Sequence, residues 1–145
     1  MSLPKPEPGL VIRYSYLWLR EHRAGQEEGS KDRPCAIVLA AGEQDGATKV
    51  LVVPVTHNPP DDPATALELP LSVKKHLGLD GERSWVSLSE SNLFDWPGPD
   101  LRRVPQRGDH SIAYGLIPPR VFLELRRRFL ALENKARSHR VIRTD

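Results

Sequence analysis

Two polar positions that flank two apolar runs carry side chains able to act on a phosphate group. Arg33, followed by Pro34, leads into the run "CAIVLA". Thr56 and His57 close the run "KVLVVPV". A guanidinium is permanently charged and presents a planar fork of donors to phosphate oxygens. A hydroxyl can donate to a non-bridging oxygen, and an imidazole can accept a proton near neutral pH, so together they suit cleavage of a phosphodiester.

The two apolar runs predict two central antiparallel strands that would bring these residues together. Between the runs stands "AGEQDGAT", in which the pair Asp45-Gly46 suits a turn with positive φ. Arg33 lies about a dozen residues before this turn and Thr56 about ten after it, so both should reach the same sheet edge. On spacing alone, the plainer alternative of a loop arginine, a strand-end threonine and an exposed histidine is favoured.

The remaining patterns predict short strands and two helices. Alternation over "LVIRYSYLWL" predicts a strand, and "ALELP", "SWVSLS" and "HSIAYG" predict shorter ones, whereas "NLFDWPGPDLRRVPQRGD" is loop-like. A short helix is expected from Ser72 to Gly78. From Pro118 and Pro119 onward, apolar residues at helical spacing predict an amphipathic helix. This order favours a mainly β fold, a compact antiparallel barrel closed by the C-terminal helix.

Length and composition bound the possibilities further. The 145 residues predict one domain over 1–145, with residues 1–8 as an extended lead-in and 133–145 as a frayed tail. The net charge is only +2, but from Gly115 onward eight Arg or Lys face three Asp or Glu. A basic C-terminal third could meet phosphates or an acidic partner, and a solvated helix face is the alternative.

Other classes of site are not indicated. The single Cys35 lies within an apolar run and is expected to be a small buried hydrophobe. The histidines are scattered without metal-ligand spacing, and phosphate-cradling glycine loops are absent, so no metal and no cofactor are predicted. No apolar run is long enough to span a bilayer, which predicts a cytoplasmic protein without a membrane partner.

Four segments together resemble the MazF/PemK toxins of bacterial type II toxin–antitoxin systems. They are "PGLVI", "EEGSKDRPCAIVLA", "VLVVPVTHNPP" and "YGLIPPRVFLELRRRFLAL". The resemblance implies an SH3-like barrel, a homodimer and a growth inhibitor that a cognate antitoxin protein neutralises. It also implies a metal-independent endoribonuclease that cuts single-stranded RNA, including mRNA, through attack of the 2′-hydroxyl on its own phosphodiester.

The same resemblance assigns roles to site residues. Arg33 matches the family's catalytic arginine and Thr56 its catalytic or substrate-binding hydroxyl, whereas His57 is assigned as a base from chemistry alone. The family often carries a basic segment after a later strand, where this chain has Glu90, Asn92 and Asp95.

Four further residues are expected to bind RNA: Lys31, Trp96, Arg102 and Arg103. Trp96 could stack an unpaired base, the alternative being a loop tryptophan that Pro97 pins against the core. Arg102 and Arg103 could replace the missing basic segment. Two other functions stay open: a non-catalytic member of the fold that inhibits another protein, and a nucleic-acid-binding regulator that uses the basic C-terminal third.

Overall fold

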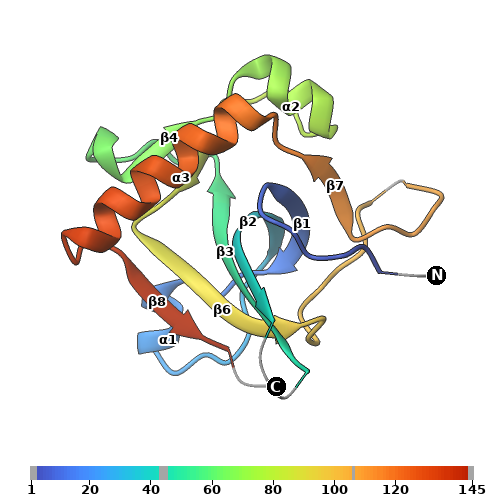
Figure 1. Cartoon of the computed structure of the whole chain (residues 1–145), viewed down its shortest axis with the longest axis horizontal. Helices are drawn as coiled ribbons and strands as arrows, with labels where there is room; N and C mark the ends of the chain where they lie inside the picture. The colour runs from blue at the N-terminus through green and yellow to red at the C-terminus, as the bar shows by residue number, and fades with distance from the viewer. Residues whose placement is uncertain (1–2, 43–45, 106, 144–145) are drawn as a thin grey trace.

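The computed structural model describes residues 3–42, 46–105 and 107–143, and its elements follow one another as Figure 1 shows. In chain order they are β1 (Leu10–Ser15), α1 (Leu19–Arg23), β2 (Asp32–Gly42), β3 (Thr48–Thr56), a 3-10 turn (Pro63–Thr65), β4 (Ala66–Glu68), α2 (Leu71–Leu77), β5 (Trp85–Ser87), β6 (Glu90–Trp96), β7 (Ala113–Leu116), α3 (Pro119–Asn134) and β8 (His139–Ile142). The fold is mainly β with helices, as the sequence predicted.

The strands form one sheet in the order β4-β5-β3-β2-β1-β7, with β6 beside β3 and β8 beside β6. The first half of β3 pairs with β6, and its last two residues pair with β5. All of these pairings are antiparallel except that of β6 with β8, which is parallel. Among the described residues, β4 and β7 end the path and do not pair with each other.

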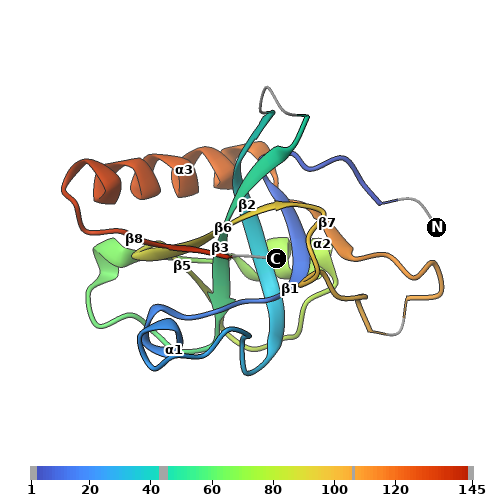
Figure 2. The same cartoon turned by 90° about the horizontal axis from the view of Figure 1, so that it is seen from below.

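Apolar side chains cover both faces of the central strands, which explains why the runs in β2 and β3 are continuous rather than alternating. On one face, Ala36 and Val53 pack with residues of α2 and α3. On the other, Ile37 and Val52 pack with Tyr14 of β1 and Phe94 of β6. Figure 2 shows α3 and α1 on opposite sides of the strands.

Several sequence expectations are confirmed. Strands β2 and β3 are antiparallel neighbours, and Gly46 of the expected turn has a φ of 88°. Its partner Asp45 lies outside the described residues. Gly78 caps the C-terminal end of α2 with a φ of 69°, although the helix begins at Leu71, after Pro70, rather than at Ser72. Helix α3 begins at Pro119 and buries the predicted apolar stripe, and Cys35 is fully buried.

The expectation that "NLFDWPGPDLRRVPQRGD" is a loop is wrong at its start, because β6 runs from Glu90 to Trp96. Polar residues interrupt the apolar pattern of this strand, and one of them, Asn92, is fully buried. The Asn92 amide group donates to the Leu17 carbonyl at 2.8 Å and accepts from the Leu17 amide at 2.9 Å. Partners 75 residues away in the chain therefore satisfy a side chain that, by itself, suggests a loop.

The expectation of a frayed tail over 133–145 is also wrong within the described residues. Helix α3 continues to Asn134, and β8 then runs beside β6 (Figure 1). Arg143 fixes the end of this strand: it is buried, and its guanidinium lies 3.1 Å from an Asp100 carboxylate oxygen and donates to the Ser15 carbonyl at 2.8 Å. A buried ion pair at the chain end opposes fraying, because opening would break it.

No helix among the described residues is long and apolar enough to cross a membrane.

Candidate functional site

The register of β2 and β3 brings the ends of the two apolar runs together. Cys35 lies opposite Pro54 and Ala36 opposite Val53. Continuing this register by two residues places Arg33 opposite Thr56, and the Arg33 guanidinium reaches the neighbouring Val55 carbonyl at 3.4 Å. The expectation that both polar ends lie at one edge of the sheet is confirmed.

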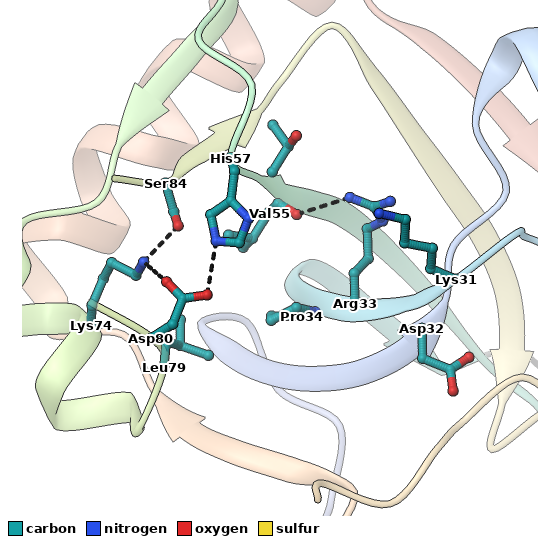
Figure 3. Close-up of a pocket in the computed structure, with 11 residues that line it drawn as sticks. Lys31, Asp32, Arg33, Pro34, Val55, His57, Lys74, Leu79, Asp80 and Ser84 are labelled. Carbon is teal, nitrogen blue, oxygen red and sulfur yellow. Dashed lines mark hydrogen bonds and ion pairs between the residues drawn. The ribbon is translucent and has the colours of Figure 1, made fainter. Parts of the chain in front are cut away.

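A cavity of about 170 Å³ opens at this edge (Figure 3). Its lining comes from the start of β2, the end of β3, α2 and the loop after α2. The residues concerned are Lys31, Asp32, Arg33, Pro34, Val55, Thr56, His57, Lys74, Leu79, Asp80 and Ser84. A wider groove of about 710 Å³ shares Lys31, Arg33, Thr56 and His57 with the cavity and continues past Trp18, Asn58 and Ser89. The two hollows adjoin each other through these four shared residues.

Arg33 has hydrogen-bond donors that no protein group uses. Its guanidinium makes one long hydrogen bond, to the Val55 carbonyl, and stands 5.0 Å from the centre of the Trp18 ring. Its Nε is buried without a hydrogen-bond partner, and no carboxylate among the described residues pairs with it. Neighbouring Lys31 is exposed and likewise has no ion pair within the described part of the chain. Two cations at one edge therefore lack a counter-ion, which favours an anionic ligand.

Thr56 ends β3 with a partly exposed side chain. Its Oγ1 accepts the backbone amide of Asn58 at 3.2 Å. Because a hydroxyl is both donor and acceptor, its proton stays available for an oxygen of a ligand. Thr56 can therefore act as a hydrogen-bond donor beside Arg33.

His57 points toward the loop that follows α2. Its Nε2 lies 2.8 Å from Oδ2 of Asp80 and 3.7 Å from Oε2 of Glu82. Oδ1 of Asp80 in turn accepts from Nζ of Lys74 at 2.6 Å. The side chain of Lys74 is only 2% exposed, so an ammonium at the cavity wall is held by protein groups.

The environment of Asp80 keeps its carboxyl ionised. Partial burial acts to raise the pKa of Asp80, but hydrogen bonds from Lys74, from the Glu82 amide and from His57 outweigh it and hold the pKa below the ordinary 3.8. At neutral pH the Asp80 side chain is therefore an acceptor only.

One group among the described residues has the composition of a metal site. Ligand atoms of His57, Asp80 and Glu82 all lie within 4.8 Å of one another. All three residues are exposed, and the ammonium of Lys74 already neutralises Asp80 at 2.6 Å. A positive charge in that position opposes a second cation, so we assign the cluster to hydrogen bonding.

The structure does not bring the other expected RNA-binding residues to this cavity. Trp96 ends β6, opposite Thr48, and packs on Phe94 with ring centres 6.2 Å apart. Arg102 donates to the Pro99 carbonyl at 2.8 Å and lies 3.6 Å from Asp32, and Arg103 contacts His110 at 3.3 Å. Lys31 alone of these four lines the cavity.

The acidic and amide residues that replace the expected basic segment have roles in the fold. Glu90 accepts the Tyr16 hydroxyl at 3.0 Å and the Leu19 amide at 2.9 Å. Asn92 is buried against Leu17, and Asp95 pairs with Lys49 at 2.5 Å. These side chains hold α1 and β3 in place. Their structural role explains why the segment is not basic, and it leaves the assignment of a site at Arg33 unaffected.

Sequence reasoning missed Lys74, Asp80 and the groove residue Trp18. An aspartate two residues after the Gly78 helix end was the available signal for Asp80. Lys74 gave none, because a lysine in "SVKKHLGLDG" is expected to be solvated. Trp18 is half-buried and lines the groove.

Comparison with protein-family models, with curated proteins and with solved structures finds no match to this chain.

Proposed function

We propose that this protein is a metal-independent endoribonuclease that cleaves single-stranded RNA at the cavity beside the start of β2 and the end of β3. One observation carries the proposal: Arg33, with donors that no protein group uses, lies beside Thr56 and His57 at one edge of the sheet. A phosphodiester supplies the anion that Arg33 and Lys31 lack. The resemblance of the sequence to MazF/PemK toxins supports the same reaction.

The reaction can be written with these residues. His57 accepts the proton of the 2′-hydroxyl as the 2′-oxygen forms a bond to phosphorus. Arg33 stabilises the extra negative charge on the pentacovalent phosphorus, and Thr56 donates to a non-bridging oxygen. The bond from phosphorus to the 5′-oxygen then breaks, and that oxygen takes a proton from water. The products are a 2′,3′-cyclic phosphate and a 5′-hydroxyl, and His57 returns its proton to solvent.

The fold and partners follow the same proposal. We propose that the sheet is a variant of the SH3-like barrel closed by α3, and that the protein forms a cytoplasmic homodimer. In this proposal it is a growth inhibitor neutralised by a cognate antitoxin protein. A partner with acidic side chains suits Lys31 and Arg33, because it could satisfy the two unpaired cations without RNA.

The test is cleavage of single-stranded RNA in EDTA by the wild type and by Arg33→Ala. We expect the wild type to leave 2′,3′-cyclic phosphate ends and the variant to lose about 10²-fold or more in kcat, as when one oxyanion donor is removed. Arg83→Ala is the matched control, since Arg83 is exposed and pairs with Glu68 outside the cavity. Equal cleavage by the wild type and Arg33→Ala would remove Arg33 from the mechanism.

A non-catalytic, protein-binding inhibitor is the second candidate function. Exposed Leu123 and Leu130 on α3, 62% and 44% accessible, favour it because they offer apolar area to a partner protein. It predicts that induced expression of Arg33→Ala still inhibits growth while Leu123→Ser/Leu130→Ser does not. The ribonuclease proposal predicts the reverse.

A further inference from the structure

Hydrogen bonds connect the interior of the protein to the imidazole of His57. Lys74 of α2 donates to Oδ1 of Asp80 and to Oγ of Ser84, each at 2.6 Å. Oδ2 of the same carboxylate lies 2.8 Å from Nε2 of His57. Figure 3 shows Asp80 between the ammonium and the imidazole. One carboxylate thus joins a buried lysine to a side chain of the proposed active site.

Lys74 serves to hold Asp80 and has no donor left for a ligand. Its third hydrogen bond goes to the backbone carbonyl of Glu82, so all three protons of the ammonium are used. The Glu82 amide also donates to Oδ1 of Asp80, at 3.1 Å. Because a buried ammonium is costly without a paired charge, Lys74 and Asp80 stay together. Oδ1 is therefore held by two donors, and Oδ2 remains directed at His57.

This contact determines which nitrogen of the neutral imidazole carries the proton. An ionised carboxylate can only accept, so Nε2 must be the donor to Asp80. In a neutral imidazole the other nitrogen, Nδ1, then has a free lone pair. Figure 3 shows that nitrogen on the side of the ring that faces Arg33, away from Asp80. The unprotonated nitrogen is thus presented to the cavity.

We propose that Asp80 is a positioning residue that holds His57 in the tautomer with the proton on Nε2, so that Nδ1 accepts the proton of the substrate's 2′-hydroxyl. Lys74 acts one step further back by holding Asp80. The identity of the substrate rests on the proposed ribonuclease function, whereas the tautomer does not. In the reaction the 2′-O–H bond breaks, its proton moves to Nδ1 and the 2′-oxygen bonds to phosphorus.

The experiment compares wild type with Asp80→Asn by ¹⁵N NMR of the histidines and by RNA cleavage. At a pH of about 8.5, where imidazole is neutral, we expect the proton of wild-type His57 on Nε2. The amide of Asp80→Asn can donate to Nε2 and so favours the opposite tautomer. We expect kcat to fall about 10²-fold or more with KM within about threefold, because positioning acts on the chemical step. His57→Ala assigns the resonances.

A second variant separates positioning from loss of the fold. Lys74→Met/Asp80→Asn removes both charges, so no unpaired ammonium is left buried, and we expect the same change of tautomer and the same loss in kcat. Glu124→Gln is the control: it breaks ion pairs with Arg127 and Arg128 on α3, outside the cavity, and should keep wild-type kcat.

Two results would overturn the inference: a wild-type His57 that carries its proton on Nδ1, or an Asp80→Asn variant whose kcat stays within about threefold of wild type although His57→Ala is inactive. A wild type that cuts no RNA would reject the proposed function instead. In that case an Nε2 tautomer that is lost in Asp80→Asn would still support the positioning role.

Discussion

Among the described residues, no carboxylate pairs with Arg33, although it lines a cavity. Arg127, Arg137 and Arg143, by contrast, each have an acidic partner within 3.1 Å. An uncompensated guanidinium at a cavity needs an anion, and a phosphodiester presents two non-bridging oxygens that match its fork. The geometry of that fork, as well as the charge, should therefore matter.

Arg33→Lys tests the fork directly, because lysine keeps the charge but offers a point-like ammonium. We expect kcat/KM for RNA cleavage to fall by about tenfold or more, which is less than for Arg33→Ala. Arg83→Lys is the matched control outside the cavity and should cleave like the wild type. Full activity in Arg33→Lys would show that charge alone suffices.

Glu90 predicts an unusual dependence of stability on pH. Burial raises the pKa of the Glu90 carboxyl above its ordinary 4.5, although the Leu19 amide and the Tyr16 hydroxyl act against this. A raised pKa in the folded state favours the protonated form, so this contribution to stability is complete below pH 4.5 and is lost as pH rises through the folded pKa. Glu90→Gln keeps the Oε1 acceptor without the charge.

We therefore expect Glu90→Gln to melt at a higher temperature than wild type at a pH of about 7 and the gap to close as pH falls toward about 4. Thermal unfolding of both proteins across this pH range measures the difference in melting temperature. A wild type that is the more stable of the two near neutral pH would show that the carboxylate charge stabilises the fold.

At the scale of elements, the loop between α1 and β2 carries Lys31 to the cavity and leads into Arg33 of β2, and Gly29 fixes the path of this loop. A Cβ on Gly29 would collide with the carbonyl oxygen of Tyr16 and lie 2.8 Å from its carbonyl carbon. Both are backbone atoms, so they cannot rotate away as a side chain would. The loop and the end of β1 must separate if Gly29 is replaced.

Gly29→Ala should lower the free energy of unfolding by about 1–3 kcal/mol and reduce RNA cleavage, because the loop that carries Lys31 and leads into Arg33 moves. Gly42→Ala is the matched control: its Cβ would meet no heavy atom within 4 Å, and we expect a change within about 0.5 kcal/mol. Chemical denaturation and cleavage assays measure both. Equal stability of the two variants would contradict the clash.

Elements built from local patterns could be predicted, and those built from distant partners could not. The continuous apolar runs of β2 and β3 and the periodic apolar stripe of α3 are visible in the local sequence alone. Strand β6 could not be predicted, because its buried Asn92 is satisfied by Leu17, 75 residues earlier. Strand β8 depends on parallel pairing and on the contacts of Arg143, which local sequence does not encode.

The residues of the candidate site likewise include some that local sequence predicts and some that it does not. Arg33, Thr56 and His57 could be placed together because one hairpin fixes their register. Lys74 and Asp80 reach His57 only because α2 packs beside the end of β3, a tertiary arrangement that spacing in the sequence does not give. Of the missed residues, Lys74 and Asp80 position another side chain, whereas Trp18 lines the groove.

At the scale of the whole molecule, five of the eight basic residues from Gly115 onward form ion pairs, in part with carboxylates from earlier in the chain. Glu124 pairs with Arg127 and Arg128, and Asp62 pairs with Arg137. A deletion of the residues after Leu132 cannot test whether this region binds RNA, because it would also remove β8 and the buried Arg143. Substitution of single charges is the sharper test of where RNA binds.

The dependence of RNA affinity on salt can locate the phosphate contacts. Each cation that neutralises a phosphate of a single strand contributes about 0.7 to the slope of log K against log salt concentration. Lys31 lines the cavity without an ion pair among the described residues, and exposed Arg126 of α3 is likewise unpaired there. The two residues form a matched pair of single positive charges, one inside the proposed site and one outside it.

We expect Lys31→Ala to reduce the magnitude of the slope by about 0.7 and Arg126→Ala to leave it unchanged. Binding of single-stranded RNA would be measured by fluorescence anisotropy over a salt series in the His57→Ala background, so that the RNA is not cut. A regulator that binds through its C-terminal third predicts the opposite pair of results. A reduced slope in Arg126→Ala alone would therefore place the bound RNA on α3 rather than at the cavity, because counterion release reports only the cations that contact phosphate.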